Sequence, residues 1–142
     1  MGIAALVTWV ITAGIGSFML SRWATRGGVR RTPGAGTHFP PARVFTHFGL
    51  AAAGLIVWII YLVTDSEILT WIALADLALI ALLGALLVTR WTKDGRAAMR
   101  GERAEVDLAE QHIPRPPVLL HGIFAVSTVI LVLLTALGIG GT

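Results

Sequence analysis

Residues 68–88 read ILTWIALADLALIALLGALLV, a continuous apolar run that contains one charged residue, Asp76. A helix needs about 20 mostly apolar residues to cross the hydrocarbon core of a bilayer, and this run is long enough. Three further runs without any charge lie at residues 3–20, 44–63 and 118–139. None of them alternates polar with apolar residues, as the strands of a membrane barrel do. The sequence therefore predicts four membrane-spanning helices.

The composition agrees with lipid contact. Of the 142 residues, 56% are hydrophobic and 13% are charged. A soluble fold of this size has too little interior to hide so much apolar surface. Cysteine is absent, which excludes disulfides and thiolate metal sites. We predict a single all-α domain over residues 1–142, an integral membrane four-helix bundle surrounded by the lipid bilayer.

The first run is predicted to be retained and not to be a cleaved signal peptide. A signal peptide has basic residues ahead of its apolar stretch. Here no basic residue precedes Ile3, whereas Arg22 and Arg26 follow the run. This charge distribution favours a first span whose N-terminus lies outside the cytoplasm.

The basic residues predict the orientation of the bundle. All 11 Lys and Arg residues fall in two connections, between the first and second spans and between the third and fourth. The short connection 64–67 has Asp65 and Glu67 but no base. By the positive-inside rule, the two basic loops are cytoplasmic, and both termini lie outside the cell membrane. Acids nearly balance bases in the second loop, so the net charge of +3 does not indicate nucleic-acid binding.

The two long loops are predicted to differ. Residues 27–41 are rich in Gly, Pro and Thr, which is typical of a flexible connector. Residues 96–110 favour a helix near the lipid headgroups, although a docking site for a partner stays open. Pro114, Pro116 and Pro117 should delimit the fourth span. No internal repeat is strong enough to support an argument.

Two histidines are the residues most informative about function. His47 lies near the start of the second span and His121 near the start of the fourth. Both spans run in the same direction, so the two side chains should lie at one depth and point into the bundle, away from lipid. Two imidazoles at one level on different helices are what a six-coordinate b-type haem requires. Structural hydrogen bonding, a metal site and a proton relay are the alternatives.

Small and basic residues near the histidines also suit a haem. Gly54 lies on the same helix face as His47. Gly14, Gly16 and Gly84 would leave further room on the neighbouring helices, unless they serve only close helix packing. Haem propionates are anions that prefer helix N-termini and bases, and Arg43 and Arg115 flank the starts of the second and fourth spans.

This arrangement resembles the small membrane b-type cytochromes, including the cytochrome b561 group and the haem-bearing anchors of succinate dehydrogenases. His47, Gly54 and His121 carry the resemblance, which covers residues 44–139. It implies one haem b near the cytoplasmic side and electron transfer in a respiratory or redox membrane system. The b561 group has two histidine pairs for two haems, whereas this chain has no second pair near the outer face.

Asp76 should be neutral much of the time, because no Lys or Arg lies within the membrane to pair with it. It is a candidate proton site, serving a quinone or electron transfer, or else it donates a hydrogen bond to a hydroxyl. The candidate hydroxyls are those of Thr8, Thr12 and Thr135. The aromatic residues near the span ends, Trp23, Trp58, Tyr61, Trp71 and Trp91, are interpreted as interfacial belts.

A cofactor-free accessory or scaffold subunit of a larger membrane complex is the alternative function. In that case the exposed helix faces would bind other subunits, and the chain could also form an oligomer. A small transporter built around Asp76 is a weaker hypothesis, because the sequence has no pair of broken helices. The loops are too short to enclose a soluble active site, so an electron-transfer protein or subunit is favoured over a stand-alone enzyme.

Overall fold

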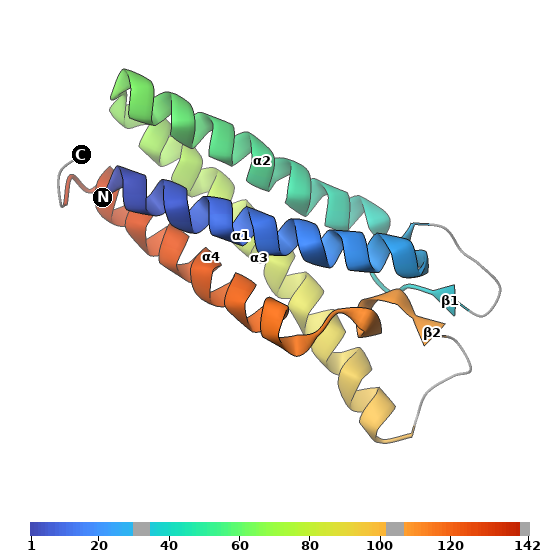
Figure 1. Cartoon of the computed structure of the whole chain (residues 1–142). Coiled ribbons are helices and arrows are strands. Elements are labelled where there is room, and N and C mark those ends of the chain that lie inside the picture. The colour runs from blue at the N-terminus through green and yellow to red at the C-terminus, as the bar shows by residue number, and fades with distance from the viewer. Residues whose placement is uncertain (30–34, 102–106, 140–142) are drawn as a thin grey trace.

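The computed structural model describes residues 1–29, 35–101 and 107–139. Its four long helices are α1 (Gly2–Trp23), α2 (Pro41–Thr64), α3 (Glu67–Met99) and α4 (Arg115–Ala136). Successive helices run in opposite directions along one bundle (Figure 1). Each is long and apolar enough to cross a membrane, which confirms the predicted all-helical architecture with four candidate spans.

Prolines define where two of the helices begin. Pro40 precedes α2 and Pro114 precedes α4, each with an extended backbone. Proline holds φ near its helical value and has no N–H to lose, so it suits the first turn of a helix. The prediction that prolines delimit the fourth span is confirmed. Between α2 and α3, Asp65 adopts a left-handed conformation with φ 53° and closes a short turn.

The second long loop differs from the predicted helix over residues 96–110. α3 continues to Met99, and at 33 residues it is about 50 Å long, well beyond the bilayer core. Beyond it, β2 (Asp107–Leu108) pairs in parallel with β1 (Ala35–Gly36), and η2 (Ala109–His112) is a 3₁₀ helix. The helix prediction holds for residues 96–99 and is wrong for residues 107–110, whereas residues 102–106 lie outside the described part of the chain. Tertiary hydrogen bonds to the first loop override local helix propensity there.

The end of α1 is shaped by two glycines. α1 continues into a π-helical turn, η1 (Ala24–Gly28), in which Gly27 has φ 98°. A side chain at Gly28 would collide with the ring of Trp23, so the backbone packs directly on the indole. The predicted flexible connector over 27–41 falls partly on residues 30–34, outside the described residues.

The helices pack as two close pairs, α1 with α4 and α2 with α3. One apolar core lies at the end where α1 begins, which we call the terminal end; it contains Ala5, Trp9, Trp58, Tyr61, Ala73, Leu77 and Val132. A second core lies at the opposite end, which bears the two long loops and which we call the loop end. It contains Trp23, Phe39, Ala109 and Ile113.

The interfacial-belt interpretation is wrong for three of the aromatic residues. Trp58 is 0% exposed and Trp23 is 1% exposed, and Tyr61 is also buried. Trp58 Nε1 donates to the Gly2 carbonyl oxygen at 3.1 Å, so the indole N–H is satisfied inside the bundle. Trp71 is 44% exposed, in keeping with a surface position.

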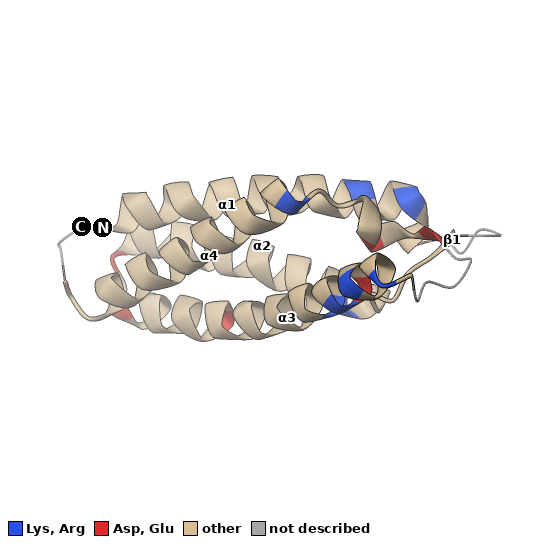
Figure 2. Cartoon of the chain, turned by 90° about the horizontal axis from the view of Figure 1, so that it is seen from below, with Lys and Arg blue, Asp and Glu red and all other residues tan. Residues whose placement is uncertain are grey.

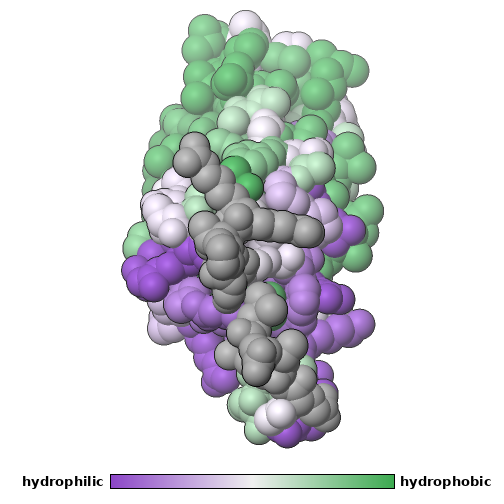
Figure 3. Space-filling model, turned by 90° about the vertical axis from the view of Figure 1, so that its right-hand side faces the viewer, coloured by the Kyte–Doolittle hydropathy of each residue, from purple (hydrophilic) through white to green (hydrophobic). Residues whose placement is uncertain are grey.

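The described Lys and Arg residues gather at the loop end (Figure 2). Viewed from that end, hydrophilic residues occupy the middle and lower part of the surface, whereas the upper part is mainly hydrophobic (Figure 3). Large apolar side chains such as Ile3, Val63, Leu82 and Ile123 are exposed along the helices. Contact with a lipid bilayer accounts for this exposure. Arg30, Arg31 and Arg103 lie outside the described residues.

Candidate functional site

The structure brings the side chains of His47 on α2 and His121 on α4 close together. The centroids of their imidazole rings are 6.3 Å apart, and the ring planes are inclined by 53°. Both side chains are partly buried. Each histidine lies two helical turns beyond the proline that precedes its helix, which explains why the rings reach the same level. The predicted common depth is confirmed.

Hydrogen bonds define the tautomer of both rings. His47 Nδ1 lies 3.0 Å from the carbonyl oxygen of Ile80 on α3, and His121 Nδ1 lies 3.0 Å from that of Thr12 on α1. A carbonyl oxygen can only accept, so Nδ1 carries the proton and donates in both cases. Nε2 of each neutral ring therefore keeps a free lone pair, and no described residue hydrogen-bonds it. An imidazole held in this way is ready to bind a metal.

Two glycines make room for the rings. A Cβ at Gly84 of α3 would lie 3.2 Å from His47 Cε1, and a Cβ at Gly16 of α1 would lie 3.1 Å from His121 Cε1. These contacts are tighter than an ordinary van der Waals separation, so larger residues would displace the imidazoles. Gly16 and Gly84 thus leave space for the imidazoles, whereas nothing described lies within 4 Å of a Cβ at Gly14; the room predicted for a haem ring stays a prediction.

The two imidazole environments are copies of one arrangement. In each, a histidine donates to a carbonyl on the neighbouring helix and rests against a glycine one turn further along that helix. Other buried positions match as well, as in the pairs Ala5 and Ala73, Trp9 and Leu77, Gly54 and Thr128, and Trp58 and Val132. The hairpin α1–α2 is therefore equivalent to the hairpin α3–α4.

The sequence alone indicated no usable internal repeat, and the matching contacts correct that conclusion. A signal was present in His38-Phe-Pro40 and His112-Ile-Pro114, each followed at the same spacing by His47 or His121. It is short, and the helices after it share few identical residues. Only the matching contacts reveal that the two halves are equivalent.

The spacing of the rings fits axial ligands of one metal. An imidazole nitrogen binds a transition metal at about 2.0 Å and lies about 1 Å from the centre of its ring. Two imidazoles on opposite sides of one metal therefore have centroids about 6 Å apart, close to the 6.3 Å found here. The donor set is two neutral nitrogens from separate helices, as a bis-histidine haem requires.

Gly54 has a neighbour that the sequence did not indicate. A Cβ there would collide with Asp76 Oδ2 of α3, and it would lie 2.9 Å from Trp9 Cζ2 of α1. The space left by the missing side chain is occupied by the Asp76 carboxyl group. Gly54 lies two turns further along α2 than His47, so its direct contacts are with Asp76 and Trp9 and not with the imidazoles.

The hydrogen bond predicted from Asp76 to a threonine hydroxyl is absent among the described residues. The three hydroxyls bond within their own helices, Thr8 to Ala5, Thr12 to Thr8 and Thr135 to Leu131. That interpretation of Asp76 is therefore wrong. Asp76 Oδ2 is buried and has no hydrogen-bond partner in the described part of the chain. The position that matches Asp76 in the first hairpin is Thr8, which accepts a 2.9 Å hydrogen bond from Thr128.

Arg43 and Arg115 lie in the first turns of α2 and α4. Neither forms an ion pair with any described residue. Arg115 is exposed and Arg43 is partly buried. Both residues lie near the loop end, and their contact with haem propionates stays a prediction.

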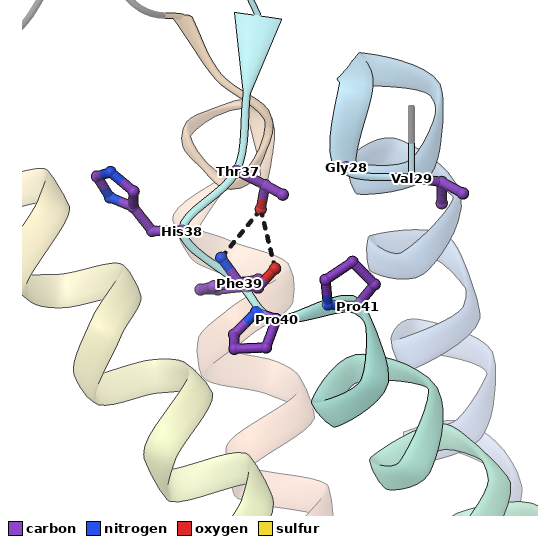
Figure 4. Close-up of a pocket in the computed structure, with 7 residues that line it drawn as sticks. All are labelled: Gly28, Val29, Thr37, His38, Phe39, Pro40 and Pro41. Carbon is purple, nitrogen blue, oxygen red and sulfur yellow. Dashed lines mark hydrogen bonds between the residues drawn. The ribbon is translucent and has the colours of Figure 1, made fainter. Parts of the chain in front are cut away.

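The other two histidines each face an aspartate. His38 Nδ1 lies 3.0 Å from Asp94 Oδ1, and His112 Nε2 lies 2.9 Å from Asp107 Oδ2. Both loop-end histidines are therefore paired with a carboxylate. Beside His38, a pocket of about 210 Å³ is lined by residues 28–29 and 37–41 (Figure 4). This pocket lies at the loop end and does not include His47 or His121.

No protein-family model matches this chain, and no curated protein or solved structure matches it either. The histidine pair and the groups that position it are therefore the basis of the functional proposal.

Proposed function

We propose that this chain binds one haem b through His47 and His121 and transfers electrons in a respiratory or redox membrane system. The observation that carries the proposal is the pair of imidazoles at 6.3 Å, each with Nδ1 engaged and Nε2 free. A structural histidine needs no such matched partner. Two copies of the same support, one per hairpin, suit a ligand that is coordinated equally from both sides.

Each group around the rings has a part in holding the ligands. The carbonyl oxygens of Ile80 and Thr12 orient the imidazoles and increase the basicity of Nε2. Gly84 and Gly16 let the rings lie close to the neighbouring helices. Arg43 and Arg115 would neutralise the propionates, together with the N-termini of α2 and α4. A bound haem would supply the one-electron chemistry.

The proposed setting is the cell membrane, with the loop end in the cytoplasm and both termini outside. The gathering of Lys and Arg at the loop end supports this orientation. It would put the haem near the cytoplasmic side, within reach of a soluble donor or another redox subunit. A quinone would be a membrane-soluble partner, and further copies of the chain could associate through the apolar helix faces.

Asp76 is proposed as a proton site. Its Oδ2 atom is buried against Gly54 of α2, and no described residue forms a hydrogen bond with it. A carboxyl group in such surroundings can take up a proton when an electron enters the bundle, because the proton offsets the added negative charge.

The deciding experiment is an absorption spectrum of the detergent-purified protein supplied with haem. We expect the sharp bands of a low-spin, six-coordinate b-type centre. His47→Ala and His121→Ala should each abolish the spectrum or convert it to a high-spin form, since one imidazole cannot supply both axial bonds. The matched controls are His38→Ala and His112→Ala, which remove loop-end histidines and should leave the spectrum intact. A protein without Soret absorption would reject the haem proposal and favour the cofactor-free accessory subunit.

A further inference from the structure

A second group of potential metal ligands lies at the loop end. We propose that His38, Asp94 and Glu110 bind one divalent metal ion of the zinc class, separately from the His47–His121 pair. One ligand atom from each residue lies within 4.8 Å of the other two. Asp94 is about 15 Å further along α3 than Gly84, which contacts His47, so the two sites are distinct.

The carboxylates of this site are buried with little compensating charge. Glu110 is 0% exposed. Its Oε1 accepts from the His38 backbone N–H at 2.7 Å and its Oε2 accepts from Thr37 Oγ1 at 2.8 Å, but both donors are neutral. No described Lys or Arg forms an ion pair with it. A buried carboxylate without a countercharge is costly, which favours a cation beside it.

Asp94 provides an independent sign of a missing ligand. Its side chain is only 10% exposed, and its buried Oδ2 has no hydrogen bond to any residue that the structure describes. Arg90 Nε approaches this oxygen at 3.4 Å, without hydrogen-bond geometry. Arg90 pairs with Asp94, and no described Lys or Arg forms an ion pair with Glu110, so no such base offsets the Glu110 charge. A metal ion would both neutralise it and occupy the free lone pair.

The closest pair of ligand atoms suits a small transition-metal ion. His38 Nδ1 and Asp94 Oδ1 are 3.0 Å apart, and neighbouring ligand atoms in a tetrahedral zinc site are about 3.3 Å apart. The metal would replace the proton that these two atoms share, and that proton would leave to solvent. The His38 side chain is 45% exposed, which gives the ion and a fourth, water ligand a route in. In Figure 4 the His38 ring points away from the pocket beside it, toward α3.

The three ligands come from the first loop, α3 and η2. Bound metal would therefore join segments that are far apart in the sequence and stabilise the folded loop end. The other hairpin offers a matched comparison, because His112 faces Asp107 but no third described ligand completes a group there.

The test is a titration of the chelator-treated, full-length protein with Zn²⁺, followed by calorimetry and by thermal unfolding. We expect one site whose occupation raises the unfolding temperature. His38→Ala and Asp94→Asn should each weaken binding at least tenfold and remove the rise, whereas the control His112→Ala should keep both. A circular-dichroism spectrum equal to that of the parent will show that each variant is folded.

Free Nε2 atoms at the histidine pair could also attract zinc, so the titration is repeated in His47→Ala. Zinc binding that persists there and disappears in His38→Ala supports the loop-end site. Binding that is absent in the parent, unchanged in His38→Ala and Asp94→Asn, or lost in His47→Ala would overturn it. Since the haem spectrum is read separately, failure of one proposal leaves the other standing.

Discussion

The Nδ1 hydrogen bonds of His47 and His121 decide which ring nitrogen is free for coordination. Both acceptors are backbone carbonyl oxygens, which cannot reverse the direction of the bond. Side-chain substitutions at Ile80 and Thr12 therefore leave the acceptors in place. Substitution of the glycines beside the rings should instead affect the imidazole positions, even when the added side chain is small.

Substitution of these glycines should disturb the ligands without removing them. In Gly84→Ala the new methyl would lie 3.2 Å from His47 Cε1, and in Gly16→Ala it would lie 3.1 Å from His121 Cε1. We expect a few-fold to tenfold loss of haem affinity or a partial high-spin signal, because the ring must move by tenths of an ångström. Gly14→Ala is the control, since its Cβ would meet nothing described within 4 Å. Equal spectra and affinities in all three variants would contradict this role for Gly16 and Gly84.

Asp76→Asn tests the proposed proton site. Asparagine has nearly the same shape, so we expect stability within about 1 kcal/mol of the parent and an unchanged haem spectrum. If Asp76 takes up a proton on reduction, the midpoint potential of the parent should fall as pH rises, by up to about 59 mV per pH unit. The variant should lose this slope over the same range. A slope that is equal in both proteins, or gross misfolding of the variant, would reject the proton role.

At the scale of the elements, the hydroxyl group of Thr37 links several segments of the loop end. Thr37 Oγ1 accepts from Trp23 Nε1 at 2.9 Å and donates to Glu110 Oε2 at 2.8 Å. It thereby joins three segments: α1, η2 and the residues that precede α2. Trp91 of α3 adds a 3.0 Å bond to the Glu110 carbonyl oxygen. This network explains why residues 107–112 pack against the first loop and do not continue a surface helix.

Thr37→Val should break this connection while preserving side-chain shape. It leaves the buried Trp23 N–H and the Oε2 atom of Glu110 each without this partner, while Glu110 Oε1 keeps its bond from the His38 N–H, and each unsatisfied buried group costs about 1 to 3 kcal/mol. We expect a loss of that order in the free energy of unfolding, measured by denaturant titration. Thr89→Val is the matched control, because Thr89 is exposed and its hydroxyl bonds, among the described residues, only to the Ala85 carbonyl oxygen in its own helix. A loss no larger than that of the control would show that the network contributes little.

At the scale of the whole molecule, the bundle is two equivalent hairpins that exchange contacts. Each histidine bonds to a carbonyl of the other hairpin, so neither hairpin alone forms a complete imidazole site. The charges are distributed unevenly along the bundle, because the described Lys and Arg residues lie at the loop end. This asymmetry along the bundle underlies the proposed orientation.

Cysteine labelling measures that orientation directly, because the chain has no cysteine of its own. Ser66→Cys lies in the short turn between α2 and α3, and Met99→Cys lies at the end of α3, where Met99 is 69% exposed. In intact cells, a membrane-impermeant maleimide should label position 66 only. Position 99 should react after the membrane is opened. Labelling of both positions from one side would refute the four-span topology.

The sequence by itself determined the number of long apolar helices, their order and the common level of His47 and His121. Apolar length and the position of a residue after a proline are local properties, so they can be read along the chain. The short connection 64–67 was also evident, because the charged residues Asp65 and Glu67 interrupt the apolar runs there.

Only the tertiary structure decided what each of these side chains touches. A helix that is apolar on every side has no polar face to indicate which residues point inward. The burial of Trp58, the contact of Asp76 with Gly54 and the glycine beside each imidazole all depend on that rotation. The Thr37–Glu110 hydrogen bond likewise joins residues far apart in the chain, and such a contact forms only when the packed helices bring the two loops together.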